Sequence, residues 1–296
     1  MNKKLLKKLA VGTVQFGAKY GINKKKIPIE DIKKILINFK SIGSETIDTS
    51  PLYGGAEKIL GNYSPKKNNF QYITKIPKIN NNKISDKQIY QIKKFFFNSL
   101  KNLKKKNIYG LLIHSTKDIF KPGGNKLIDL LLFLKKKKIV RKIGISVYSK
   151  EEINNSLKKF RPDIIQIPLN LLDQRMIKNK YLSKLKKKNI EIHARSLFLQ
   201  GILTSKKNFF PFKNKKDQKQ IIEIKNNILK QNISLINACI YFGLQQKELD
   251  KLIIGFSSYR DFTEVMNSFN YSYKEFKFKN KFKINNEKIL NPSNWK

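Results

Sequence analysis

The sequence predicts an α/β fold, a (β/α)8 TIM barrel that forms a single domain over residues 1–296 with an irregular tail from about residue 271. Three observations lead to this prediction. Eight short β-rich segments alternate with amphipathic segments, which favours parallel strands joined by right-handed helical crossovers. The strand segments are nearly continuous apolar runs, as expected when both faces of a sheet are buried. The glycine fingerprint of the competing doubly wound sheet, G-x-G-x-x-G after a first strand, is absent.

The predicted strands are apolar runs bounded by polar or turn residues. They cover residues 9–16, 45–50, 70–76, 109–114, 141–148, 163–170, 190–196 and 252–257. In such a barrel the functional site is built from the carboxyl ends of the strands and the loops that follow them. Residues 205–220 and the tail from Tyr271 show neither pattern, and we expect them to be irregular and to lie over the barrel mouth.

The predicted helices have recognisable ends. The helix expected over residues 27–43 has Pro28 in its first turn and stops at Gly43. The helices expected over residues 85–103 and 149–160 open with Ser-x-x-Gln and Ser-x-x-Glu, which is the spacing of a capping box.

The chain has a formal net charge of +42, from 63 Lys and Arg against 21 Asp and Glu. Such a field could serve to bind nucleic acid, or it could reflect the Lys-, Asn- and Ile-rich composition of an AT-rich genome. The second interpretation is favoured because readers of phosphates and bases rely on Arg forks. Only five of the basic residues are arginines: Arg141, Arg161, Arg175, Arg195 and Arg260. The lysines are spread over the whole chain, so no specific nucleic-acid partner is expected.

The sequence carries few features that indicate a cellular compartment. Cys239 is the one cysteine and lies in an apolar helical pattern, so a buried thiol is expected rather than a disulfide framework or a multi-cysteine metal site. The basic N-terminus has too short an apolar stretch for a signal peptide. The longest apolar run, residues 127–134, is interrupted by Asp129 and is too short to span a membrane. The sequence therefore predicts a cytoplasmic protein with no membrane partner.

Ionisable groups stand at the ends of three consecutive predicted strands. These groups are Asp48, Lys75 and His114, and Tyr53 lies in the loop after Asp48. Taken singly, each has an ordinary structural explanation: the Asp as a helix cap, the Lys as a solvated cation, the His as a core residue. Their conjunction at one end of a barrel is much harder to obtain by accident.

These four groups suit the reduction of a carbonyl. The pKa of a free phenol is about 10, and an ammonium held beside Tyr53 is expected to lower it and stabilise the phenolate. The carboxylate of Asp48 would keep Lys75 charged and in place, and a neutral His114 can donate a hydrogen bond to a carbonyl oxygen. No side chain donates hydride, so a nicotinamide cofactor is required.

The chain resembles the aldo-keto reductase superfamily along almost its whole length. The segment "IDTSPLYGGAEKILG" (47–61) is similar to that family's Asp-Thr-x-x-x-Tyr-Gly-x-x-Glu-x-x-Leu-Gly signature. The segments "YITK" (72–75), "LLIH" (111–114), "GIS" (144–146), "QIPLN" (166–170) and "IIGFSS" (253–258) follow in the family's order. The closest likeness is to bacterial members associated with sugar and surface-polysaccharide modification.

The resemblance implies a catalytic tetrad of Asp48, Tyr53, Lys75 and His114. It also implies NADPH, with NADH as the alternative, bound across the barrel mouth without a Rossmann domain. The cofactor-binding residues carried over from the family are Ser146, Gln166, Arg195, Ser196, Leu197, Gly201, Gly255, Ser257, Arg260 and Glu264.

The chain departs from the family pattern at several positions. Val147 replaces an Asn that would bind the nicotinamide carboxamide, and Val265 replaces a usual Asn on the adenine side. Arg195 stands where a Tyr commonly stacks on the nicotinamide; its guanidinium could stack in the same way, or it could bind an anionic substrate or the pyrophosphate. Gly255 and Asp261 stand where many members carry basic residues for the 2′-phosphate. Arg260, or the hydroxyls at positions 257 and 258, could take that role.

The sequence thus predicts NAD(P)H-dependent reduction of an aldehyde or ketone to an alcohol, with Tyr53 as the proton donor. The alternative is a sensor or regulatory protein that keeps the fold and the cofactor but has little turnover. The expected partner is a small-molecule carbonyl compound, possibly derived from a sugar, with Tyr20, Tyr148, Phe198 and the tail as candidate walls of its pocket. A monomer is the family's commonest state.

Overall fold

A computed structural model describes residues 3–269, 282–284 and 286–295. Eight parallel strands close into a barrel in the order β1 to β8, and β8 pairs with β1. The strands are β1 Leu9–Gly12, β2 Thr46–Asp48, β3 Gln71–Ile76, β4 Ile108–Ile113, β5 Val140–Ser146, β6 Ile164–Pro168, β7 Glu191–Arg195 and β8 Lys251–Gly255. The predicted TIM barrel is therefore confirmed.

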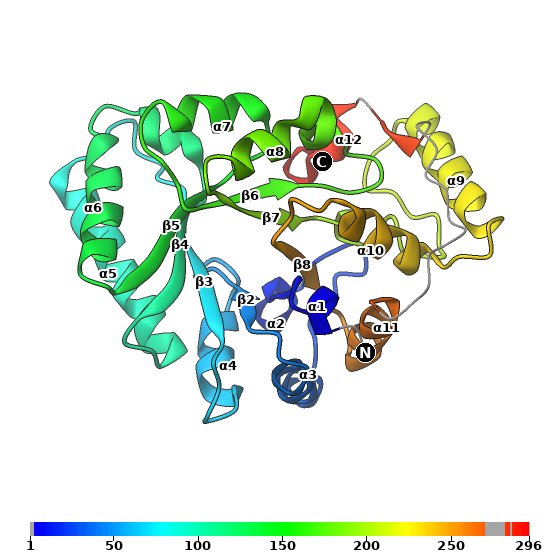
Figure 1. Ribbon diagram of the computed structural model, residues 1–296, viewed down its shortest axis with the longest axis horizontal. Coiled ribbons are helices and arrows are strands. Elements are labelled where there is room, and N and C mark those ends of the chain that lie inside the picture. The colour runs from blue at the N-terminus through cyan, green and yellow to red at the C-terminus, as the bar shows by residue number, and fades with distance from the viewer. Residues whose placement is uncertain (1–2, 270–281, 285, 296) are drawn as a thin grey trace.

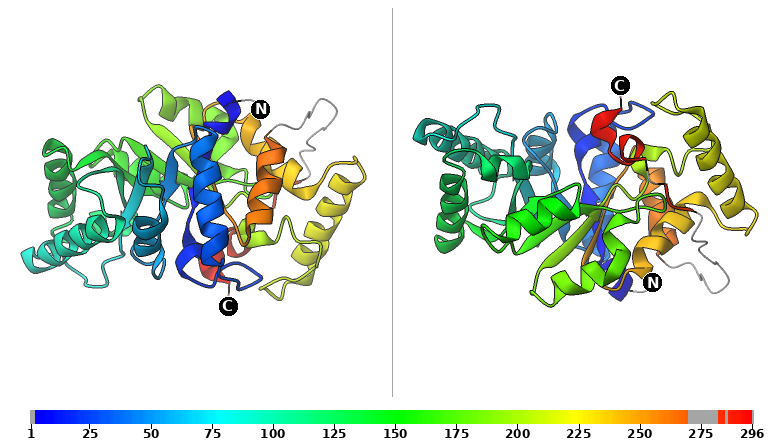
Figure 2. Two further views of the ribbon diagram at one scale, coloured as in Figure 1. Left: turned by 90° about the horizontal axis from the view of Figure 1, so that it is seen from below. Right: turned by 90° about the horizontal axis from the view of Figure 1, so that it is seen from above.

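Helices surround the strands (Figure 1). The α-helices are α1 Lys3–Leu6, α2 Val14–Gly17, α3 Ile29–Ser41, α4 Ala56–Tyr63, α5 Asp86–Leu103, α6 Asn125–Lys136, α7 Lys150–Leu157, α8 Tyr181–Lys186, α9 Lys215–Leu229, α10 Leu235–Gln245, α11 Tyr259–Ser268 and α12 Glu287–Leu290. Short 3-10 turns are η1 Thr116–Phe120, η2 Arg175–Lys180, η3 Leu199–Gly201 and η5 Pro292–Asn294. Figure 2 shows α3 and α11 side by side, where the first and last units of the barrel meet.

Each predicted strand is present, but the first is shorter than expected. β1 ends at Gly12, and residues 14–16 of the predicted strand belong instead to helix α2. The reason is local. The backbone N–H and the hydroxyl of Thr13 both donate to the backbone oxygen of Asp48, at 3.1 and 2.9 Å, and the chain then turns out of the sheet.

The helix ends follow the predicted chemistry closely. Pro28 is the N-cap residue of α3, and Gly43, just past its end, has a φ of +73°, which suits glycine. Ser85 forms both halves of a capping box on α5. Ser149 forms only half of one on α7, because the Glu152 carboxylate accepts from the backbone N–H of Tyr148 instead of from that of Ser149.

The two segments expected to be irregular are only partly so. Residues 205–214 have no helix or strand, but from Lys215 the chain forms α9, which is capped by the Asn214 side chain. Part of the tail expectation falls on residues 270–281 and 285, which lie outside the described residues. In the described part of the tail, the backbone N–H of Ile284 donates to Leu172 in the loop after β6, so this part does pack beside the barrel mouth.

The barrel interior is arranged in layers. A small apolar cluster of Ile73, Leu112 and Ile164 fills its middle, and a much larger apolar shell lies between strands and helices. Polar side chains occupy the two ends of the interior, at the carboxyl and amino ends of the strands. The candidate site lies at the carboxyl end.

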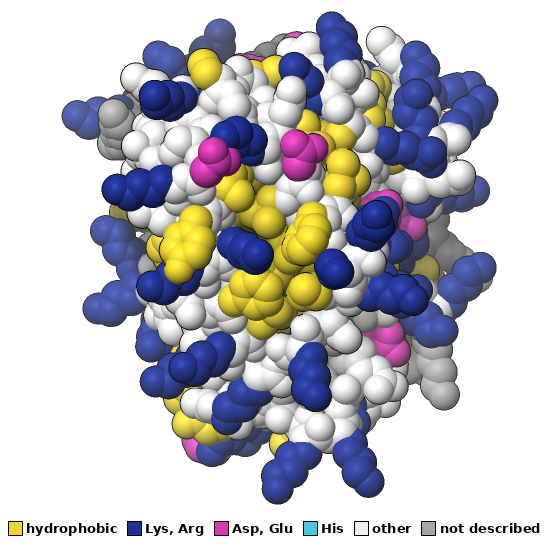
Figure 3. Space-filling view, turned by 90° about the vertical axis from the view of Figure 1, so that its left-hand side faces the viewer, with side chains coloured by type: hydrophobic (Ala, Val, Ile, Leu, Met, Phe, Trp, Pro, Cys, Tyr) yellow, Lys and Arg dark blue, Asp and Glu magenta, His cyan; other side chains and the backbone are white. Residues whose placement is uncertain are grey.

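The surface carries the charge. Figure 3 looks onto the α5–α6 side, where exposed apolar side chains are interspersed with lysines. Lys93 and Lys137 lie over the ring of the exposed Phe133, at 5.6 and 5.9 Å from its centroid. The thiol of Cys239 is buried, as predicted. Among the described residues no helix is both long and apolar enough to cross a membrane.

Candidate functional site

A buried ion pair lies at the centre of the barrel mouth. Lys75 Nζ, on β3, lies 2.8 Å from both carboxylate oxygens of Asp48, on β2. It also donates to the backbone oxygen of Thr49 at 3.0 Å. Burial by itself would lower the pKa of Lys75, but Asp48 and Tyr53 hold it above its ordinary value. The lysine is therefore charged and held in place.

The loop after β2 places Tyr53 beside this ion pair. Its hydroxyl lies 3.4 Å from Lys75 Nζ. The expectation of a lowered phenol pKa is wrong: burial raises the pKa of Tyr53, and the Lys75 ammonium only opposes that effect. The phenol is therefore protonated at neutral pH and keeps its proton available for donation.

The loop that carries Tyr53 packs tightly against helix α2. Gly54 has a φ of +59°, and a Cβ there would lie 2.5 Å from the backbone oxygen of Gly17. A Cβ on Gly17 would lie 1.8 Å from the backbone oxygen of Tyr53. Two glycines therefore let two backbones approach closely, and this contact fixes the position of the phenol.

His114 follows β4 beside the same mouth. Burial, with the charges of Lys75 and Arg195 adding to it, lowers the pKa of His114 to about 4. The imidazole is therefore neutral near pH 7, as predicted, and can donate one hydrogen bond.

Gln166 reaches Asp48 from the opposite side of the barrel. Its Nε2 donates to Asp48 Oδ1 at 2.5 Å. Sequence reasoning placed Gln166 on the cofactor and missed this contact, because β2 and β6 come together only when the barrel closes. Its Oε1 is buried and has no hydrogen-bond partner among the described residues.

Arg195 ends β7 and lies over Tyr148. The guanidinium carbon is 4.3 Å from the centroid of the Tyr148 ring, and one terminal nitrogen donates to the backbone oxygen of Val147 at 3.0 Å. Its positive charge acts on His114 and Tyr53, so Arg195 belongs to the same electrostatic unit. The buried Nε of Arg195 has no partner within the described part of the chain.

The loop after β7 has an unusual backbone. Ser196, Leu199 and Gln200 have φ values of +65°, +46° and +55°, and Gly201 has +98°. Left-handed conformations at non-glycine residues are uncommon and cluster at functional sites. Leu197, in contrast, is buried in the core, so its side chain is not presented to the mouth.

The start of α11 differs from what was expected. The N–H and hydroxyl of Ser257 both donate to the carboxylate of Asp261, the N–H at 3.0 Å, and the Ser258 hydroxyl accepts from the Asp261 N–H at 3.0 Å. Both serine hydroxyls proposed for a 2′-phosphate are therefore already engaged by Asp261. The other residues assigned to this end of the cofactor, Gly255, Arg260 and Glu264, are exposed.

The mouth fits a nicotinamide. A carboxamide needs a hydrogen-bond acceptor for its NH₂ group, and the unpartnered Gln166 Oε1 is such an acceptor. Ser146 is the Cα partner of Gln166 in the β5–β6 register and is also buried, so both assigned residues stand side by side at the strand ends.

One buried acid in the signature segment had no role assigned to it. Glu57, on α4, is buried and accepts from the Thr74 hydroxyl at 2.7 Å. Burial raises the pKa of Glu57. Because Thr74 precedes Lys75 on β3, this contact ties α4 to the strand that carries the lysine. A glutamate in the first turn of a helix otherwise indicates no more than a favourable dipole interaction, so this contact could not be predicted from the sequence.

Comparison with known proteins gives the family. The chain has the fold of the aldo-keto reductase AKR11C1 from Bacillus halodurans in its holo form (TM-score 0.69, 16% identity, covering 90% of this chain and 87% of that one). It is also similar to the glycerol dehydrogenase AKR11B4 from Gluconobacter oxydans (TM-score 0.66, 22% identity, 90% and 87%). No curated protein matches it by sequence. The model of the aldo/keto reductase family matches residues 8–284. The chain therefore belongs to the aldo/keto reductase family and is an oxidoreductase that acts on carbonyl or alcohol groups.

Proposed function

We propose that this protein reduces an aldehyde or ketone to an alcohol with a nicotinamide cofactor, and that Asp48, Tyr53, Lys75 and His114 carry the chemistry. One observation carries the proposal. The Tyr53 hydroxyl lies 3.4 Å from an ammonium that is itself locked 2.8 Å from a buried carboxylate. A binding protein would have no need to bury such a pair beside a phenol.

Each residue has a distinct task. Tyr53 holds the proton and gives it to the carbonyl oxygen as negative charge develops there. Lys75 stabilises the phenolate that remains, and Asp48 keeps Lys75 charged. The neutral His114 donates a hydrogen bond to the carbonyl oxygen and orients it.

Residues at the ends of β5, β6 and β7 would hold the cofactor. Gln166 Oε1 and Ser146 would bind the nicotinamide carboxamide, and Arg195 lies beside them. When bound, the nicotinamide supplies the hydride that no side chain can donate.

NADPH is the cofactor expected from the family resemblance, and many members of the family place basic residues for the 2′-phosphate at the positions of Gly255 and Asp261. Asp261 favours NADH instead. A carboxylate there accepts a hydrogen bond from a ribose hydroxyl but repels a phosphate. The exposed Arg260 would instead favour NADPH, because its positive charge attracts a 2′-phosphate. Cofactor binding should therefore be measured with both NADH and NADPH.

The test compares the wild-type protein with Tyr53→Phe. We expect the variant to bind the cofactor as the wild type does, by quenching of its fluorescence, and to lose at least about 10²-fold in turnover of an aromatic aldehyde. Equal turnover in the two proteins would exclude Tyr53 as the proton donor. Tight cofactor binding with no turnover of any carbonyl compound in either protein would support the sensor alternative.

A screen of carbonyl compounds, made once turnover is established, would identify the substrate class. The similarity to a glycerol dehydrogenase is a reason to include small polyols and their oxidised forms in the screen with sugar-derived carbonyl compounds. A monomeric state, a single domain over residues 1–296 and a cytoplasmic location stay predictions from the sequence.

A further inference from the structure

A polar cavity lies at the end of the barrel opposite the candidate site. Its volume is about 490 Å³. It is lined by Lys7, Lys8, Tyr109, Lys142, Lys186, Asn189, Ile190, Glu191, Asp250 and Lys251. Glu191 and Lys251 are the first residues of β7 and β8, so this is the amino-terminal end of the strands, which we call the barrel floor. Arg195, at the mouth, ends the strand that Glu191 begins.

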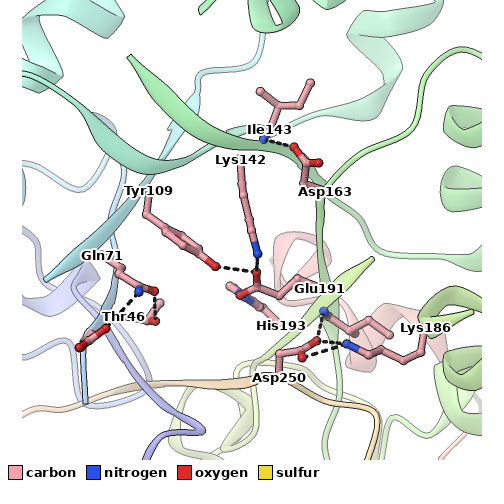
Figure 4. Close-up of polar contacts among 12 residues, drawn as sticks. Thr46, Gln71, Tyr109, Lys142, Ile143, Asp163, Lys186, Glu191, His193 and Asp250 are labelled. Atoms are coloured by element: carbon pink, nitrogen blue, oxygen red, sulfur yellow. Dashed lines mark hydrogen bonds and ion pairs between the residues drawn. The ribbon is translucent and has the colours of Figure 1, made fainter. Parts of the chain in front are cut away.

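The two carboxylates that line the cavity, Glu191 and Asp250, are already neutralised (Figure 4). Glu191 forms an ion pair with Lys142 and accepts from the Tyr109 hydroxyl at 2.8 Å and from the buried His193 at 2.7 Å. Burial alone would raise the pKa of Glu191, but His193 and Lys142 hold it well below its ordinary value. The glutamate is therefore ionised and fully engaged.

Asp250 is occupied in the same way. Lys186 Nζ lies 2.9 and 2.8 Å from its two oxygens, and the backbone N–H of Ile192 donates to it at 2.7 Å. Two of the five lining lysines, Lys142 and Lys186, are thus paired with the two lining carboxylates.

Three lysines remain at the floor without a carboxylate within ion-pair distance among the described residues. Lys251 Nζ donates to the backbone oxygen of Lys7 at 2.7 Å. Lys8 Nζ is 3.4 and 3.5 Å from the backbone oxygens of Gln246 and Lys247. A backbone oxygen satisfies one hydrogen of an ammonium but does not neutralise its charge.

The surroundings of Lys8 and Lys251 disfavour their charged state. Burial lowers the pKa of Lys8, and Lys186 adds to the effect, although Asp250 and Glu248 oppose it. Burial also lowers the pKa of Lys251, and Lys142 adds to it, against Glu191, Glu45 and Asp250. An anion in the cavity would favour the charged forms of Lys8 and Lys251 and supply further hydrogen-bond acceptors.

We propose that the floor cavity binds a small phosphoryl anion through Lys8 and Lys251. A phosphoryl group offers several oxygens to the ammonium groups that line this cavity, and the cavity has the size of a small-molecule site. The site is separate from the mouth, so the proposal does not depend on the proposed reaction. Free phosphate and a phosphorylated metabolite share this chemistry.

Calorimetric titration tests the proposal at about 0.15 M salt, where long-range attraction to the bulk charge is screened beyond about 8 Å. The probes are inorganic phosphate, pyrophosphate and a sugar monophosphate. The double variant Lys8→Gln/Lys251→Gln is compared with Lys87→Gln/Lys117→Gln, which removes the same charge from exposed positions. We expect saturable binding of at least one probe with one site, weakened at least about tenfold in the floor variant only.

Three results would overturn the proposal: no saturable binding of any probe, many equivalent weak sites, or equal weakening in both double variants. If the floor variant fails to fold by circular dichroism, Lys251→Arg and Lys251→Gln replace it. The arginine keeps the charge and should retain binding, whereas the glutamine should not. The relative affinities of the three probes distinguish a free phosphate from a phosphorylated metabolite.

Discussion

At the scale of single residues, the cost of burying charges at the barrel mouth is offset by the pairing of opposite charges. Lys75 and Asp48 are both nearly inaccessible to water, and either charge alone in that position would be costly. Their contact, with Gln166 and the Thr49 backbone completing the hydrogen bonds, makes the pair tolerable. The polar groups of the site therefore depend on one another, because removal of one would leave another buried charge or polar group without its partner.

His114 gives a prediction about pH. Its pKa is about 4 in the folded protein against 6.5 for an unperturbed histidine, so between these values the unfolded chain binds more protons. Stability should therefore fall as the pH drops from 6.5 towards 4, and His114 should contribute no slope above 6.5. Urea unfolding across this range should show a shallower fall for His114→Asn than for the wild type. Parallel slopes in the two proteins would contradict the assignment.

At the scale of elements, the site depends on loops held by close backbone contacts. The loop after β2 is fixed against α2, the loop after β7 against residues 21 and 22, and α11 is capped by its own first turn. Rigid strands place Asp48, Lys75 and Gln166, and packed loops place Tyr53.

Gly17 tests the role of these contacts. In Gly17→Ala the new methyl group would meet the Tyr53 backbone at 1.8 Å, so the loop must shift and carry the phenol with it. We expect kcat for aldehyde reduction to fall by about 10²-fold, as misplacements near 1 Å can cause. Gly55→Ala is the matched control, because a Cβ there meets nothing within 4 Å. Wild-type kcat in Gly17→Ala would show that this contact does not position Tyr53.

At the scale of the whole molecule, closure of the barrel is what assembles the site. Asp48 on β2 and Gln166 on β6 are 118 positions apart in the chain and meet across the barrel axis. The same closure creates the floor, where the strand starts bring lysines from the N-terminus, β5, α8 and β8 around one cavity.

The net charge of +42 gives a prediction at this scale. We expect weak binding to duplex DNA with no sequence preference, because lysines act as point charges and do not read base edges as Arg forks do. With about six phosphate contacts, affinity should fall on the order of 10³-fold between about 50 and 200 mM salt. Fluorescence anisotropy with several unrelated duplexes of equal length measures this. A preference for one duplex that survives high salt would overturn it.

Much of this fold could be predicted from the sequence, because interactions between residues close in the chain determine the strands, the helices and their ends. The alternation of apolar strands with capped helices predicted the barrel, and Ser85 and Gly43 marked helix ends where the structure has them. The strand-end positions of Asp48, Lys75 and His114 were also readable, since parallel strands must end at one rim.

The tertiary structure alone decided the features that depend on closure and burial. The raised pKa of Tyr53 arises from desolvation, which no spacing of residues reveals. The bond from Gln166 to Asp48 and the floor lysines that lack an ion-pair partner among the described residues depend on which distant side chains share a space. The sequence determined which groups stand at the ends of the strands, because that follows from local periodicity. Their partners and ionisation states were decided by long-range packing, because burial and Coulomb interactions depend on distance in space and not along the chain.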